Sequence, residues 1–152
     1  MDKKKNILIT GGAGFIGTNL ARALIKESWN VTILDNFLPQ VHGGNNQIAN
    51  DLIGHTKLII GDVTDKDVFT SALVGQNAVI HLAAETGTGQ SMYAIQQYMD
   101  VNVGGTGIML DILANNHWEK PIYFTGGAQA KEEYIWLKDY LQLDGMTFKL
   151  VP

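Results

Sequence analysis

The chain has 152 residues, of which 45% are apolar and 17% charged, and its net charge is −4. This length fits one domain with a substantial core, and the acidic balance argues against nucleic-acid binding. The absence of cysteine excludes disulfides and thiolate catalysis, and no apolar run is long enough to span a bilayer or resembles a signal peptide. We therefore expect a single cytoplasmic domain over residues 1–152 without nucleic-acid or membrane partners.

Strand-like and helix-like segments alternate along the chain. In order, the pattern predicts strand 6–10, helix 15–28, strands 31–35 and 57–61, helix 65–74, strand 78–83, helix 92–115, strand 121–125, helix 130–143 and strand 147–151. Apolar residues on one face of the first helix are Phe15, Ile16, Leu20, Ala23 and Leu24. The alternation predicts an α/β protein with a three-layer Rossmann fold, a parallel sheet with helices on both faces. The stretch 36–56, rich in Gly and Asn, is either a functional loop or a poorly ordered one.

The most specific motif is the glycine-rich segment TGGAGFIG at positions 10–17. It fits G-x-G-x-x-G through Gly12, Gly14 and Gly17, and T-G-x-x-G-x-x-G through Gly11, Gly14 and Gly17. Glycine there permits the tight turn off the strand, the approach of backbone to a pyrophosphate, and close packing of helix on strand. Because an apolar strand precedes the motif and an amphipathic helix follows it, the motif predicts a dinucleotide site at a helix N-terminus.

Asp35 supplies the matching acidic residue, at the end of the second predicted strand and 18 residues beyond Gly17. A carboxylate there accepts hydrogen bonds from the adenosine ribose and repels a 2′-phosphate. The following residues, 36–38, are Asn, Phe and Leu, so no cation is present to receive that phosphate. The sequence therefore predicts NAD rather than NADP, and the missing G-K-[ST] ending excludes a P-loop kinase.

The chain resembles the extended short-chain dehydrogenases/reductases of the NAD-dependent nucleotide-sugar epimerase and dehydratase type. The resemblance rests on ITGGAGFIGTNLARALI at 9–25, LDN at 34–36, GDVTD at 61–65, HLAAETGTGQS at 81–91 and YMDVNVGGTGIMLDIL at 98–113. Together with PQVHG at 39–43, these segments are most similar to nucleoside-diphosphate 6-deoxyhexose 4-epimerases. The resemblance implies hydride-transfer chemistry on a nucleotide-sugar, with NAD as cofactor.

The resemblance also implies roles for individual positions around the cofactor. The implied cofactor-binding residues are Gly11, Gly14, Phe15, Ile16, Gly17, Asp35, Asn36, Asp62, Val63, Leu82, Ala83, Ala84 and Asn102. Asp62 and Val63 correspond to adenine contacts, and Asn102 to a helix asparagine that supports the active site. Ala83 and Ala84 also fit plain helix–sheet packing. His81 is interpreted as a core histidine, and the other histidines show no metal-ligand spacing, so no metal is predicted.

Members of the family carry Ser or Thr after the fifth strand and then Tyr-x-x-x-Lys, and this chain offers Thr125, Tyr134 and Lys138. Tyr and Lys four residues apart lie on one face of a helix, where the ammonium lowers the phenol pKa for proton abstraction. The alternative is that Tyr134 belongs to the apolar face of that helix. Only eight residues separate Thr125 from Tyr134, where the family has a longer loop.

The family continues beyond the sixth strand into a sugar-binding domain, and no such domain is expected within residues 1–152. The family binds its nucleotide diphosphate with cationic groups from that domain, whereas the single arginine here, Arg22, fits surface solvation equally well. Three interpretations follow: an enzyme completed by a partner chain, an NAD-binding module without turnover, or a fragment of an epimerase. We expect the isolated chain to turn over weakly or not at all, and to form a homo-oligomer through exposed apolar surface.

Overall fold

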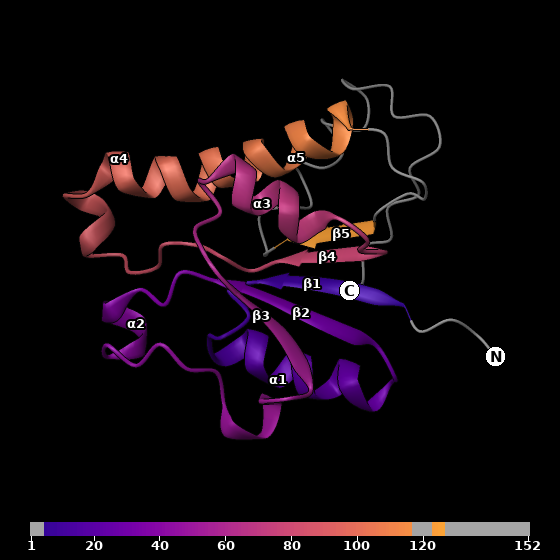
Figure 1. Cartoon of the computed structure of the whole chain (residues 1–152). Helices are drawn as coiled ribbons and strands as arrows, with labels where there is room; N and C mark the ends of the chain where they lie inside the picture. Colours follow the sequence, from indigo (N-terminus) through magenta and orange to yellow (C-terminus); the bar gives the residue numbers. More distant parts are fainter. Residues whose placement is uncertain (1–4, 117–122, 127–152) are drawn as a thin grey trace.

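The computed structural model describes residues 5–116 and 123–126, and these residues contain one parallel sheet (Figure 1). Its strands are β1 (Asn6–Thr10), β2 (Asn30–Asp35), β3 (Thr56–Ile60), β4 (Ala78–His81) and β5 (Tyr123–Gly126). They lie in the order β3-β2-β1-β4-β5, and Ile9 of β1 lies opposite Ile33 on one side and Ile80 on the other. The chain therefore winds first to one side of β1 and then to the other, so the strand order reverses between β1 and β4.

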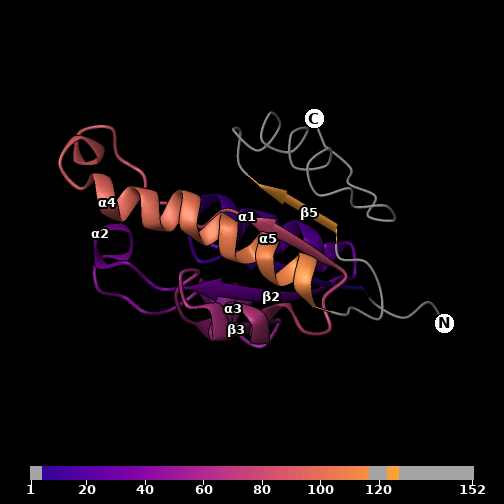
Figure 2. The ribbon, with the colours of Figure 1, turned by 90° about the horizontal axis from the view of Figure 1, so that it is seen from above.

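Helices cover both faces of this sheet (Figures 1 and 2). Helix α1 (Phe15–Lys26) covers one face, and α3 (Lys66–Leu73) and α5 (Thr106–Asn115) cover the other. Successive side chains of β1 alternate between the two layers, with Leu8 packed toward α3 and α5 and its neighbours Ile7 and Ile9 toward α1. The predicted three-layer Rossmann fold is confirmed.

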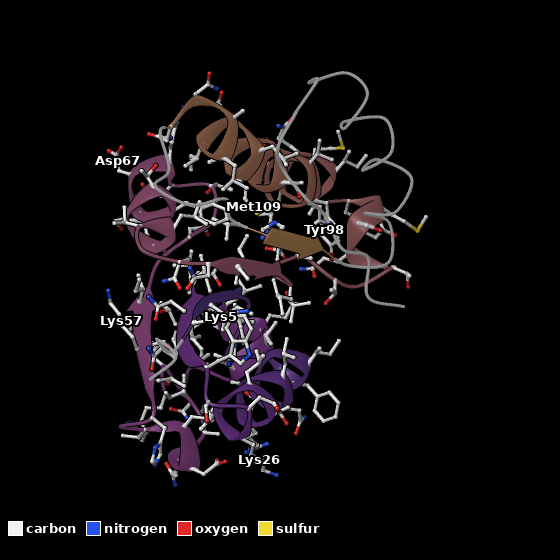
Figure 3. All side chains as sticks on the ribbon, turned by 90° about the vertical axis from the view of Figure 1, so that its right-hand side faces the viewer. Lys5, Lys26, Lys57, Asp67, Tyr98 and Met109 are labelled. Atoms are coloured by element: carbon white, nitrogen blue, oxygen red, sulfur yellow. The ribbon has the colours of Figure 1, made fainter. Side chains whose placement is uncertain are left out.

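Two apolar clusters, one in each layer, form the core. The cluster beneath α3 and α5 contains Leu8, Leu34, Val63, Phe69, Ala72, Leu73, Val79, Met109, Ile112 and Leu113. The cluster on the α1 side contains Ile7, Ile9, Ala21, Val31, Ile33, Phe37, Ile48 and Leu52. Figure 3 shows Met109 on the helical layer facing the sheet. Burial of each large apolar side chain stabilises the fold by about 1.5–3 kcal/mol. These two clusters therefore provide most of the free energy that holds the helices against the sheet.

The first helix is shorter than predicted, and its apolar face is different. It ends at Lys26 because Ser28 adopts a left-handed backbone with φ of 64°. Phe15 and Ile16 are 88% and 67% exposed, whereas Ala21 is fully buried. Of the residues predicted to share one apolar face, Leu20 and Leu24 pack against the core, whereas Phe15 and Ile16, in the first turn of α1, do not.

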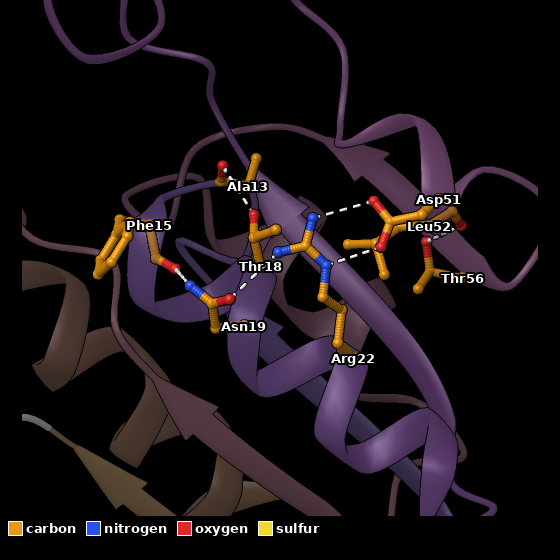
Figure 4. A network of polar contacts seen from close by, with 8 residues as sticks. All are labelled: Ala13, Phe15, Thr18, Asn19, Arg22, Asp51, Leu52 and Thr56. Atoms are coloured by element: carbon orange, nitrogen blue, oxygen red, sulfur yellow. Dashed lines mark hydrogen bonds and ion pairs between the residues drawn. The ribbon is translucent and has the colours of Figure 1, made fainter.

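The stretch 36–56 is more regular than its composition suggests. It contains α2 (Pro39–His42) and the 3₁₀ segment η1 (Asn50–Leu52), and its apolar residues Phe37, Ile48 and Leu52 are buried against the α1 layer. On the outside, the Arg22 guanidinium binds both carboxylate oxygens of Asp51 at 2.7 and 3.0 Å (Figure 4). The stretch is thus anchored to α1 from inside and outside.

The predicted helix 92–115 is divided into several segments. A 3₁₀ segment η2 (Gln90–Met92) is followed by α4 (Ile95–Tyr98), the π-helical segment η3 (Met99–Gly105) and α5. The apolar spacing predicts a helix with a constant value of about 3.6 residues per turn, so it does not reveal the change to a π-helical turn at η3.

The remaining predicted boundaries are close to the observed ones. Helix α3 begins one residue later than predicted, after Asp65, whose side chain caps it by accepting from the N–H groups of Asp67 and Val68. The predicted helix 130–143 and strand 147–151 lie outside the described residues. Among the residues that are described, no helix is long and apolar enough to cross a membrane.

Candidate functional site

The proposed cofactor residues gather at the carboxyl edge of the sheet. Parallel strands end at the same edge, so the segments that follow β1, β2, β3 and β4 meet there. They bring together Gly11, Gly14, Phe15, Ile16 and Gly17 after β1, Asp35 and Asn36 at the end of β2, Asp62 and Val63 after β3, and Leu82, Ala83 and Ala84 after β4. In Figure 1 the short helix α2 and helix α4 lie at this same end of the molecule.

The glycine-rich turn packs backbone against backbone. Gly11 has a left-handed φ of 64°, and a Cβ there would lie 2.8 Å from the backbone nitrogen of Ala83. A Cβ on Gly17 would lie 2.5 Å from the Cα of Gly12, so the first turn of α1 packs directly on the loop. Glycine is required at Gly11 by both its conformation and its neighbour, and at Gly17 by close packing.

The N-terminus of α1 is open toward this edge. Gly14 is its N-cap residue and no side chain caps it, and the first intrahelical bond runs from the Thr18 N–H to the Gly14 carbonyl at 2.9 Å. The N–H groups of residues 15 and 16 precede that bond in the exposed first turn and are available to an anion, which the helix dipole also favours. The exposed apolar side chains of Phe15 and Ile16 lie beside them.

The Asp35 carboxylate is fixed by backbone donors on both oxygens. Oδ2 accepts from the Ala13 N–H at 3.0 Å, and Oδ1 accepts from the Phe37 N–H at 2.9 Å. The first bond ties the end of β2 to the glycine-rich turn. A carboxylate has further lone pairs beyond these two bonds, so the group remains able to accept from hydroxyls.

Asn36 and Asp62 join the ends of β2 and β3. The Asn36 amide donates to Asp62 Oδ2 at 2.9 Å, while Oδ1 accepts from the backbone and hydroxyl of Thr64 at 2.9 and 2.8 Å. Burial alone would raise the pKa of Asp62, but these bonds from Thr64 and Asn36 outweigh it and hold the pKa below its usual range. The Val63 side chain is buried against Gly105, so Val63 presents backbone rather than side chain at this edge.

Thr10 and His81 form a junction between β1 and β4 that the sequence interpretation did not include as a site. The Thr10 hydroxyl accepts from the N–H groups of Leu82 and Ala83 at 3.1 and 3.2 Å and lies 2.7 Å from His81 Nδ1. Because its lone pairs serve the two backbone donors, we assign its proton to the bond with Nδ1. His81 is buried and stacked on Phe69, and burial lowers its pKa to about 4.

This arrangement places His81 in the core as predicted, with one qualification. Nδ1 is an acceptor, so the neutral ring carries its proton on Nε2, and Nε2 has no hydrogen-bond partner among the described residues. Within the same residues, no group of three or more His, Asp or Glu side chains is placed to hold a metal ion.

Asn102, on the π-helical segment η3, supports the loop that follows β4. Its side chain accepts from the Glu85 N–H at 2.8 Å and donates to the Glu85 carbonyl at 3.1 Å. The Tyr98 hydroxyl, also labelled in Figure 3, reaches the carbonyls of Thr86 and Gly87 at 2.9 and 3.0 Å. The segment 85–87 is therefore held in shape from α4 and η3, next to the proposed cofactor residues Leu82, Ala83 and Ala84.

The proposed catalytic residues are only partly placed. Thr125 lies on β5, opposite Ile80 of β4, whereas Tyr134 and Lys138 lie outside the described residues. Arg22 is bound to Asp51 on the outer side of α1 and to Asn19 at 3.1 Å (Figure 4), so its guanidinium fork is occupied there. This contact favours the surface interpretation of Arg22 over diphosphate binding.

Several residues that shape the site carried little sequence signal. Thr10 is the first residue of the glycine motif, and this position is the one sequence feature that could have identified it as part of the site. Tyr98 and His42 lie in segments that carry the family resemblance, but no role was assigned to them, because Tyr98 contacts backbone carbonyls and His42 contacts Asp35 only once the chain has folded.

Comparison with known proteins supports the prediction of family. The pattern of the NAD dependent epimerase/dehydratase family matches residues 7–135. The dTDP-L-rhamnose 4-epimerase of Burkholderia thailandensis is 38% identical over 116 residues, covering 74% of this chain and 31% of that protein. A bifunctional UDP-glucose and UDP-xylose 4-epimerase of Pisum sativum is 31% identical over 127 residues, covering 78% of this chain and 36% of that protein.

Solved structures agree on the fold. The UDP-glucose 4-epimerase from Brucella ovis, solved in complex with NAD, superposes with a TM-score of 0.70 at 22% identity, covering 95% of this chain and 50% of that one. The chain spans about a third of the length of the curated relatives that it matches. The predicted resemblance is confirmed: the chain belongs to the NAD dependent epimerase/dehydratase family.

Proposed function

We propose that this chain binds NAD across the carboxyl ends of β1, β2 and β4 and serves nucleotide-sugar epimerase or dehydratase chemistry. The observation that carries the proposal is the open N-terminus of α1 beside the fixed Asp35 carboxylate. The first provides donors and a positive dipole for a pyrophosphate, and the second provides acceptors for ribose hydroxyls. The Asp35 carboxylate accepts a hydrogen bond from the Ala13 N–H, so the carboxylate and the start of α1 are held in a fixed relative position.

The residues present fit a dinucleotide in three respects. No side chain occupies the N-cap position at Gly14, the large apolar side chains of Phe15 and Ile16 are exposed next to it, and no cation accompanies Asp35 in residues 36–38. Apolar exposure of this degree at a helix start is accounted for when a ligand covers it. The carboxylate favours NAD over NADP, as the sequence also predicts.

The substrate side of the proposal rests on the loop 85–87 and on the residues proposed for catalysis. Bound NAD supplies the hydride acceptor and donor. Tyr134, with Lys138 lowering its pKa, would take the proton of a sugar hydroxyl, and Thr125 would orient that hydroxyl. The loop held by Asn102 and Tyr98 would lie along the sugar. A nucleotide-sugar is therefore the proposed substrate class, and a homo-oligomer remains the proposed assembly.

The test is a calorimetric titration of the purified chain with NAD, using two matched variants. Ile16→Glu places a negative charge beside the free N–H groups of α1, and Ile53→Glu places the same charge on another exposed isoleucine. We expect Ile16→Glu to weaken NAD binding at least about tenfold while Ile53→Glu binds like the wild type. Equal affinities in both variants, or no binding by the wild type, would contradict the proposed site.

A further inference from the structure

The Asp35 carboxylate is nearly enclosed, although it stands at the end of a strand. Only 6% of its side chain is exposed. The backbone donors Ala13 and Phe37 account for one contact on each oxygen. What can approach the carboxylate is therefore decided by whatever covers its remaining side.

His42 covers that side from helix α2. Its Nε2 lies 3.5 Å from Asp35 Oδ1, and only 12% of the His42 side chain is exposed. The ring also packs on Phe37, with centroids 5.0 Å apart and planes at 57°. Phe37 is itself 2% exposed and has a left-handed φ of 51°, so a buried residue with an unusual backbone fixes the surface on which His42 rests.

Helix α2 is closed by its own C-cap and tied to a neighbouring segment by side chains. At its C-terminus Gly43 adopts φ of 61° and donates its N–H to the Pro39 carbonyl at 2.7 Å. On the exposed side the amides of Gln40 and Gln90 exchange two hydrogen bonds, at 2.7 and 3.0 Å. His42 is therefore placed by a short helix tied to the segment after β4, and not by a loop side chain alone.

We propose that His42 is a cofactor-specificity residue, whose imidazole covers the remaining side of the Asp35 carboxylate and so restricts the space there against a 2′-phosphate. This inference rests on the proposed NAD site. A hydroxyl brings one oxygen and a proton to the carboxylate, whereas a phosphate brings three further oxygens and about two negative charges. Asp35 opposes that charge, and His42 occupies the volume that the extra oxygens need. Specificity then has a repulsive and a steric part.

The experiment compares NADP with NAD in the wild type, His42→Ala, His42→Phe and His55→Ala. All titrations are run in the same buffer at one pH. His42→Ala opens the space beside Asp35, whereas His42→Phe keeps a ring packed on Phe37. His55 is an exposed histidine after the 3₁₀ segment and serves as the control.

We expect the ratio of the NADP and NAD dissociation constants to fall at least about fivefold in His42→Ala and to stay within about twofold of wild type in the other two variants. An unchanged ratio in His42→Ala, or an equal fall in His42→Phe, would overturn the inference while leaving the NAD site intact. If His42→Ala does not fold by circular dichroism, His42→Val replaces it under the same criterion. Failure of the wild type to bind NAD would overturn the proposed function and this inference with it.

Discussion

Acid should destabilise this protein through His81, ahead of its carboxylates. His81 is 7% exposed, its Nδ1 accepts from Thr10, and burial lowers its pKa to about 4. In the unfolded chain the same ring has an ordinary pKa of about 6.5. The unfolded state therefore binds more protons between these values, so the free energy of unfolding falls as the pH falls through this window.

The size of the effect follows from the two pKa values. Between about pH 7 and pH 5 the loss amounts to about 2 kcal/mol, and by about pH 4 it reaches about 3 kcal/mol. Below the folded pKa the loss stops growing. Since small domains have about 5–15 kcal/mol of stability in total, this single group accounts for a large share.

The assay is urea unfolding followed by circular dichroism at a series of pH values from about 7 to 5, a range in which most ordinary carboxylates stay ionised. His81→Asn supplies an amide oxygen that can accept from the Thr10 hydroxyl in place of Nδ1 but does not titrate, and it lowers stability by a pH-independent amount through lost packing on Phe69. We expect its pH slope to be flatter than that of the wild type by about 2 kcal/mol over the range. His55→Asn should keep the wild-type slope. Equal slopes in His81→Asn and wild type would refute the reasoning.

Two further predictions concern the site's backbone. Gly17→Ala should lower stability by at least about 2 kcal/mol because its Cβ meets Gly12 backbone at 2.5 Å, whereas Gly107→Ala, with open space in α5, should raise it by about 0.5–1 kcal/mol in urea unfolding. The idea fails if the two changes have the same sign. Asn102→Ala should cost about 1–3 kcal/mol by leaving the Glu85 N–H and carbonyl without their partner, and should speed amide hydrogen exchange at Glu85. Unchanged exchange there would show that the loop holds its shape without Asn102.

The sequence predicted those parts of the fold that depend on local patterns. Buried strands of a parallel sheet are short apolar runs, and the glycine-rich turn joins one such run to a helix, so β1, β2 and α1 could be located from neighbouring residues alone. The family resemblance extended this to the segments after β3 and β4. Each of these features depends on a few consecutive residues.

The parts that the sequence did not predict depend on contacts between distant residues. Phe37 is buried and His42 lies on Asp35 only because the stretch 36–56 folds back on the α1 layer. Phe15 and Ile16 fit an apolar helical face, yet their exposure depends on where α1 begins relative to the sheet edge. The Thr10–His81 junction needs the register of β1 with β4, which no local pattern contains.

The π-helical segment η3 lies between two parts of a nearly continuous helix, one that supports the loop 85–87 and one that packs in the core. A π turn holds more residues than an α turn, so side chains before it are rotated in phase relative to those after it. Before and within η3, Tyr98 and Asn102 are directed to the loop 85–87, and after it Met109 and Ile112 fill the core. A one-residue insertion or deletion here would re-aim the loop supports while leaving α5 seated on the sheet. The π-helical segment is thus a position at which the support of the loop 85–87 can change independently of core packing.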